Sequence, residues 1–178
     1  MNEQEIKNLI AKYNLVRRGD KVGTYNTRGI DVEEFRREVG AHKDEIIAYF
    51  DAQEEAARQE AARKRLTFES IPGVQEVRKA RNEWSMYLSE FNRVMDSGDS
   101  IFPAAPAVDQ KALEALEQAN PDAVFALMVE KKSRSENYEI SVIAKRAYDA
   151  LCNGGNVADV KARYDEEIHQ FTMRHTWD

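Results

Sequence analysis

The side chains that could carry out acid–base or metal chemistry are few and scattered along the chain. There are three histidines, His42, His169 and His175, and a single cysteine, Cys152. Glu166 precedes His169 by three residues, which is the Glu-x-x-His spacing of di-metal helical bundles. Such a site needs that motif twice together with two further glutamates. The sequence holds one copy, so a solvated helix face is the simpler interpretation.

Motifs for phosphate or nucleophilic chemistry are missing from the sequence as well. It contains no Gly-rich phosphate loop and no G-x-S-x-G elbow. The acidic pairs Glu54-Glu55 and Glu166-Glu167 are neighbours in sequence, so on a helix their side chains point about 100° apart and not at one substrate. Cys152 is expected to be a small core residue. We therefore expect no enzymatic activity, no cofactor and no bound metal ion.

Basic residues gather on both sides of Pro72-Gly73. They are Arg58, Arg63, Lys64 and Arg65 before it and Arg78, Lys79 and Arg81 after it. In an antiparallel helical hairpin they would lie near the same end and could contact phosphate groups. In the alternative interpretation they form ion pairs along solvated helices, with Glu55, Glu60, Glu69 and Glu76. The net charge of −6 argues against a general nucleic-acid binder.

The elements that carry these residues are predicted to be mainly α-helical. Residues 3–13 place their apolar side chains on one helix face. Two short strands around Gly19-Asp20 predict a hairpin, and a glycine in the first turn position favours type II′. Asp31 is placed to cap the next helix, with Glu34 three residues on as in a capping box. The first fifty residues therefore predict a small αββαα unit.

Two long helices follow, separated by Pro72-Gly73. The first runs from about Ala41 to Ser70 and is strongly polar in its middle. The second carries apolar residues at alternating spacings of three and four, which predicts the seam of a long antiparallel helical hairpin and places Trp84 in that seam. Beyond a linker rich in Ser, Gly, Ala and Pro, three or four shorter helices predict a C-terminal helical bundle. The predicted domains are residues 1–50, 51–96 and 108–178, with a linker at 97–107.

Residues 1–50 resemble the TubC-type N-terminal docking domain of modular peptide and polyketide synthetases. The likeness rests on the order helix, hairpin, helix, helix, on the "RRGDKV" hairpin and on "HKDEIIAYF" with its apolar spacing. In that family the small domain binds the tail of a partner protein, partly through the hairpin. The resemblance implies partner contacts at Arg17, Arg18, Lys21 and Tyr25. No adenylation or condensation domain follows, so a synthetase subunit is not expected.

The whole chain resembles small proteins carried by phages and mobile elements, some of which inhibit type II CRISPR nucleases. The likeness is one of layout and of the phrases "ESIPGVQEVRKARNEWSMYLSEFNRVM" and "HTWD". It implies an anti-CRISPR protein that binds a guide-loaded nuclease, Cas9 with its guide RNA, and blocks cleavage.

Two functions follow as expectations. The first is a non-enzymatic inhibitor that binds a ribonucleoprotein, with Arg63, Lys64, Arg65, Arg78, Lys79 and Arg81 as contact residues beside those of the hairpin. The second is a protein–protein docking or coiled-coil scaffold that self-associates as a homodimer without nucleic acid. The charged N-terminus and the absence of a long apolar window predict a cytoplasmic protein without a membrane span.

Overall fold

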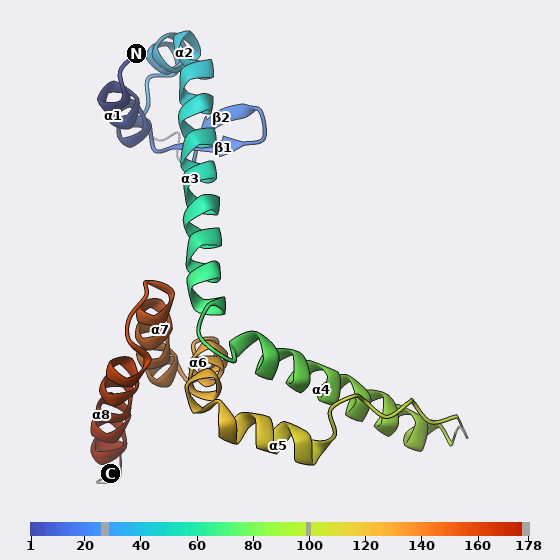
Figure 1. Ribbon diagram of the computed structural model, residues 1–178. Helices are drawn as coiled ribbons and strands as arrows, with labels where there is room; N and C mark the ends of the chain where they lie inside the picture. Colours follow the sequence, from blue (N-terminus) through green and yellow to red (C-terminus); the bar gives the residue numbers. More distant parts are fainter. Residues whose placement is uncertain (26–28, 99–100, 176–178) are drawn as a thin grey trace. The chain divides into compact units, whose positions relative to one another are not determined.

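The computed structural model describes residues 1–25, 29–98 and 101–175. Its elements are α1 (Glu3–Tyr13), β1 (Leu15–Arg18), β2 (Lys21–Thr24), α2 (Val32–Ala41), α3 (Lys43–Glu69), α4 (Val74–Ser97), α5 (Gln110–Ala119), α6 (Pro121–Lys132), α7 (Tyr138–Cys152) and α8 (Val157–His175). The mainly α fold predicted from the sequence is confirmed (Figure 1). Residues 176–178, which hold most of the "HTWD" phrase, lie outside the described residues. No helix of the described residues is long and apolar enough to cross a membrane.

The chain divides into two compact units, Met1–Ala62 and Arg63–Asp178, and the boundary falls within α3. The segment 97–107, which the sequence predicts to be a linker, belongs to the second unit.

The first unit has the predicted order α1, β1, β2, α2 and the start of α3. The strands pair antiparallel, with Arg18 opposite Lys21. Gly19 has a positive φ of 63°, whereas the φ of Asp20 is not positive. This combination fits the predicted type II′ turn. A small core of Ile6, Tyr13, Leu15, Val39 and Ile46 closes the unit.

Side chains at the helix starts of the first unit explain why its helices begin where they do. Asp31 accepts hydrogen bonds from the backbone amides of Glu33 and Glu34, at 2.9 and 3.1 Å. The capping box predicted there does not form, because the Glu34 carboxylate accepts a hydrogen bond from Lys12 of α1 at 3.0 Å instead. This ion pair joins α1 to α2.

The second unit is built around α6, whose stretch from Ala123 to Val129 is apolar on all sides. Its buried residues are Ala123, Phe125, Ala126, Leu127 and Val129. Helices α4, α5, α7 and α8 all contact it, and α7 packs on α8 as the sequence predicts. A helix that is hydrophobic all round must be buried in this way. Figure 1 shows α7 and α8 next to each other, with α4 and α5 on the other part of the unit.

The partners of α4 differ from the predicted helical hairpin. Among the described residues, α4 has its main contacts with α5 and α6. Val74, Val77 and Ala80 form its buried stripe, and the first two lie in the core cluster with the side chains of α6. The physical reason is the amount of apolar surface: alanine is the only apolar residue type in residues 51–60 of α3, whereas α6 carries the larger Phe125, Leu127 and Val129.

Candidate functional site: a basic cleft between α4 and α6

A cleft of about 1080 Å³ opens in the second unit beside the C-terminal end of α6. Three groups of residues line it: Arg78, Arg81 and Asn82 from α4; Leu127, Met128, Glu130, Lys131 and Lys132 from α6; and Arg134, Ser135 and Glu136 from the loop after α6. Five of these side chains are basic and two are acidic, so the cleft has a formal excess of three positive charges. This stands against a net charge of −6 for the whole chain.

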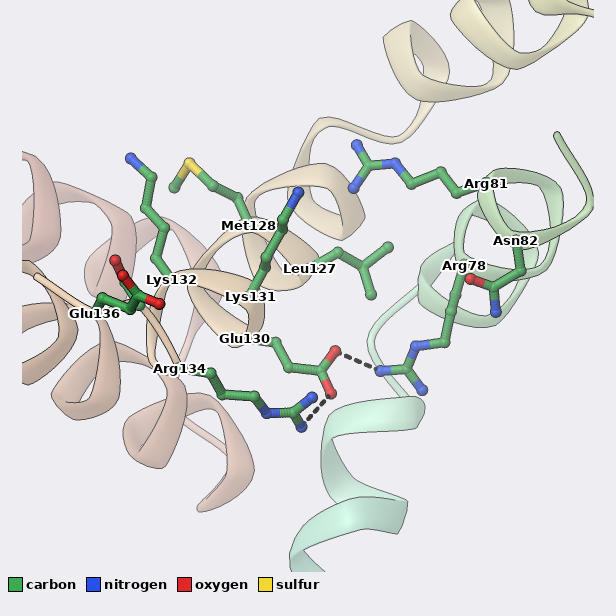
Figure 2. A pocket seen from close by; sticks show the side chains of 11 residues that line it. Arg78, Arg81, Asn82, Leu127, Met128, Glu130, Lys131, Lys132, Arg134 and Glu136 are labelled. Atoms are coloured by element: carbon green, nitrogen blue, oxygen red, sulfur yellow. Dashed lines mark hydrogen bonds and ion pairs between the residues drawn. The ribbon is translucent and has the colours of Figure 1, made fainter. Parts of the chain in front are cut away.

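Three side chains form an ion-paired triad in the cleft. Figure 2 shows Glu130 between Arg78 and Arg134, joined to both. The Arg78 guanidinium donates to Glu130 at 2.8 Å, and that of Arg134 donates at 3.4 Å. Arg134 is 74% exposed, whereas Glu130 is 20% exposed. Glu130 therefore has a firm partner in Arg78 and a loosely held one in Arg134.

Arg78 is held from two further directions. Its guanidinium also donates to Glu69 at 3.3 Å and lies over the Phe68 ring at 5.6 Å from the centroid. Glu69 accepts a second hydrogen bond, from Arg65 at 2.8 Å. That bond, helped by the nearby charge of Arg78, holds the pKa of Glu69 below its ordinary value of 4.5. The resulting stabilisation is present at neutral pH and is lost as the pH falls through that lowered pKa.

Arg81 and the two lysines occupy the remaining wall of the cleft. Arg81 donates to Glu117 of α5 at 2.6 Å. Lys131 and Lys132 are exposed, extend away from the triad in Figure 2, and have no ion pair among the described residues. They lie in the last turn of α6, where cations also offset the partial negative charge of the helix end. Their ammonium groups are thus the cleft charges open to an external anion.

Local sequence explains why these groups meet. Pro121 begins α6 at its first position, Asp122 lies in the first turn, and the helix ends at Ser133, whose amide donates to the carbonyl of Val129 at 2.8 Å. Asn137 caps α7 by accepting from the amide of Ile140 at 3.1 Å. The short loop between these caps carries Arg134, Ser135 and Glu136 back toward α4.

The basic residues predicted around Pro72-Gly73 are only partly brought together. Arg65 and Arg78 meet at Glu69, and Arg78 and Arg81 line the cleft. Lys79 lies outside the cleft lining, 3.9 Å from Glu83. Of the others, Arg58 lies 3.8 Å from Glu54, Arg63 donates to Asn153 at 3.4 Å, and Lys64 is half-buried. Ion pairing along helices, the alternative interpretation, accounts for Arg58, Arg65 and Lys79.

The predicted contact residues of the hairpin in the first unit likewise fall into two groups, one ion-paired within the unit and one exposed. Arg17 is ion-paired with Asp51 of α3 and also donates to the carbonyl of Gly19 at 2.7 Å. Arg18 lies over the ring of Tyr25 at 5.8 Å from the centroid, and Lys21 is exposed opposite Arg18. Arg17 therefore ties the hairpin to α3, whereas Arg18, Lys21 and Tyr25 form an exposed patch.

Three basic residues of the cleft were not among the residues predicted from the sequence: Lys131, Lys132 and Arg134. The available signal was the run Glu130-Lys-Lys-Ser-Arg, a short basic cluster at the end of an apolar stretch. Nothing in that run indicates that it lies beside Arg78, 52 residues away along the chain.

The Cys152 thiol of the second unit is buried. Burial raises the pKa of the Cys152 thiol and raises that of its neighbour Tyr148 to about 12. A buried thiol that stays protonated is a poor nucleophile. Among the described residues, no three His, Cys, Asp or Glu side chains cluster closely enough to hold a metal ion.

We expect Arg78 to stabilise the fold as well as to line the cleft. Replacing it with methionine keeps most of the aliphatic stem but leaves Glu69 and Glu130 without this partner. The expected loss is about 1–3 kcal/mol in the free energy of unfolding, measured by chemical denaturation. Lys79→Met is the control, because Lys79 is exposed and its pair is long; it should change stability by about 0.5 kcal/mol or less. Equal losses in both variants would contradict the role assigned to Arg78.

Comparison with known proteins adds no relative to this picture: no protein-family model matches the chain, and no significant match was found among curated proteins or solved structures.

Proposed function

We propose that this chain is a non-enzymatic binding protein that contacts phosphate groups of a macromolecular partner through the basic cleft. The observation that carries the proposal is the concentration of five basic side chains in one cleft of a chain that is acidic overall. An acidic protein with a local basic site binds phosphates there while the rest of its surface repels nonspecific nucleic acid.

The partner that fits this chemistry is a ribonucleoprotein, in which RNA phosphates and a protein surface are offered together. The resemblance to mobile-element inhibitors of type II CRISPR nucleases implies Cas9 loaded with guide RNA. In that proposal the chain binds the loaded nuclease and blocks cleavage. The exposed patch of Arg18, Lys21 and Tyr25 is a second contact surface, which the likeness to docking domains supports.

The test is a binding titration of the full chain against three preparations: guide RNA alone, Cas9 alone and guide-loaded Cas9. Each is measured at several salt concentrations, because phosphate contacts weaken as salt rises. Salt-sensitive binding that needs the guide RNA supports the proposal. Binding to Cas9 alone, with no salt dependence, would contradict the proposed phosphate contact. No binding to any of the three preparations would contradict Cas9 as the partner.

A second candidate function is a self-associating scaffold, and exposed apolar residues on α4 favour it. Leu88 and Met95 are 40% and 59% exposed, and Phe102 packs on Phe91 beside them while remaining half exposed. Light scattering across a concentration series tests this candidate. A dimer that Leu88→Glu with Met95→Glu abolishes would support it, and a monomer at every concentration would exclude it.

A further inference from the structure

The triad of Arg78, Glu130 and Arg134 has the composition of an anion site that already holds an anion. The Glu130 carboxylate accepts hydrogen bonds from two guanidinium groups, through a different oxygen in each case. Guanidinium groups bind carboxylate and phosphate with the same fork of donors. A phosphate oxygen can therefore take the place of a Glu130 oxygen without any change in the donors.

We propose that Glu130 is an internal counter-anion, which occupies part of the phosphate site of the basic cleft and is displaced when a phosphate group binds. This inference rests on the proposed function, since it concerns the ligand of the same cleft. Its ligand class is a phosphate group, carried by an RNA backbone or by a polyphosphate.

The two arginines differ in their freedom to exchange partners. Arg78 keeps Glu69 and the Phe68 ring whether or not Glu130 is present, so it stays in place. Arg134 is 74% exposed and its bond to Glu130 is long at 3.4 Å, so it is the group that moves to the ligand. Lys131 and Lys132 have no ion pair among the described residues. Their two positive charges are therefore available to the bound phosphate group.

Displacement has a cost that neutralising Glu130 removes. In the wild-type protein the ligand must break the hydrogen bond between Arg134 and Glu130. The Glu130 carboxylate then lies close to the bound anion, and the two negative charges repel each other. The amide of Glu130→Gln still accepts a hydrogen bond from Arg78 but carries no charge. Removing one negative charge a few ångströms from the ligand corresponds to an affinity increase of about five-fold.

The experiment compares Glu130→Gln with Glu136→Gln in the full chain. Glu136 also lines the cleft but has no ion pair with Arg78 or Arg134, so its variant changes the net charge equally and leaves the triad intact. The probes are a single-stranded RNA oligonucleotide and inorganic polyphosphate, each titrated by fluorescence anisotropy or competition. We expect Glu130→Gln to bind about five-fold more tightly than wild type and Glu136→Gln to bind less than two-fold more tightly.

A second variant tests whether the gain in affinity comes from the bond between Arg134 and Glu130. In an Arg134→Gln background the gain from Glu130→Gln should shrink, because the bond that costs energy to break is already absent. In the wild-type protein, side-chain NMR signals of Arg134 should shift on addition of polyphosphate, while those of Arg78 shift less. This measurement does not depend on the folding of any variant.

The outcomes separate the inference from the proposed function. Equal gains in Glu130→Gln and Glu136→Gln, with binding that still depends on Lys131 and Lys132, overturn the counter-anion and leave the phosphate cleft standing. Detectable binding by the Glu130→Gln variant, with none by the wild-type protein or by Glu136→Gln, supports the inference. No binding of either probe by any of these proteins overturns the counter-anion, and the titration against guide-loaded Cas9 then decides the proposed function. Tighter binding of RNA than of polyphosphate assigns the phosphate to a nucleic-acid backbone, and the reverse order assigns it to a free polyanion.

Discussion

Replacing Lys131 and Lys132 together with alanine is expected to weaken binding to RNA, or to an RNA-containing partner, by about 10- to 100-fold at low salt. Both ammonium groups are exposed at the cleft and have no ion pair among the described residues, so their charge is available to a ligand. Each lost phosphate contact should also lower the slope of log affinity against log salt by about one. Binding isotherms at four or more salt concentrations measure both quantities.

The matched control is Lys111→Ala with Lys145→Ala, which removes two exposed charges from α5 and α7, outside the cleft lining. This pair should leave the affinity within about two-fold and the salt slope nearly unchanged. The fold of the Lys131 and Lys132 variant should persist, since it loses only the favourable interaction with the end of α6, worth about 0.3–1 kcal/mol for each charge. Equal weakening by both pairs would mean that overall charge, and not the cleft, determines binding.

The largest effect on stability is expected from Gly73→Ala. Gly73 lies at the start of α4 with a φ of 80°, where an L side chain costs about 1–2 kcal/mol. A Cβ atom added there would also collide with the side chain of Asn120, which itself donates to the carbonyl of Leu116 at 2.9 Å. Such overpacking costs about 1–3 kcal/mol more. We expect a total loss of about 2–5 kcal/mol in the free energy of unfolding.

Gly98→Ala separates the two causes of that loss. Gly98 has nearly the same φ, 73°, but nothing lies within 4 Å of the position that its Cβ would take. Its variant should therefore lose about 1–2 kcal/mol, from the backbone alone. Chemical denaturation followed by Trp84 fluorescence, in a Trp177→Phe background, reports on the second unit. Equal losses at both glycines would show that the contact with Asn120 has no energetic weight.

Gly73 also bears on the cleft, because its turn sets the start of α4. The amide of Val74 donates to the carbonyl of Ile71 at 3.1 Å, and that of Val77 donates to Gly73 at 2.9 Å. Arg78 and Arg81 follow within two turns of that start. A shift of this turn would move both arginines relative to α6, so Gly73→Ala should weaken RNA binding in whatever fraction remains folded.

Local chemistry made the helices and the hairpin predictable. Asp31 was predicted from the sequence as a cap, and it accepts hydrogen bonds from the backbone amides of Glu33 and Glu34. The pair Gly19-Asp20 predicted its turn because only glycine adopts a positive φ there at no cost. These signals depend on residues only three or four positions apart, so they can be identified in the sequence without knowledge of the tertiary structure.

The partners of α4 were not predictable in the same way. The apolar stripe of α4 indicates that the helix must be covered, but it fits α3 and α6 equally well as a pattern. Tertiary packing selected α6, whose stretch from Ala123 to Val129 is apolar on all sides. Arg78 therefore meets Glu130, 52 residues away, in addition to Glu69 at the end of α3.

The sequence by itself determined the helical class of this protein, the limits of several of its helices, and the basic character of the residues on both sides of Pro72-Gly73. Only the tertiary structure decided which basic residues of the chain share one cleft and which of these have carboxylate partners. Arg78 and Arg81 gained carboxylate partners, while Lys131 and Lys132 remained without an ion pair among the described residues. The physical reason is that a side chain's charge belongs to its residue type, whereas the distance to its nearest counter-charge is set by how distant helices pack.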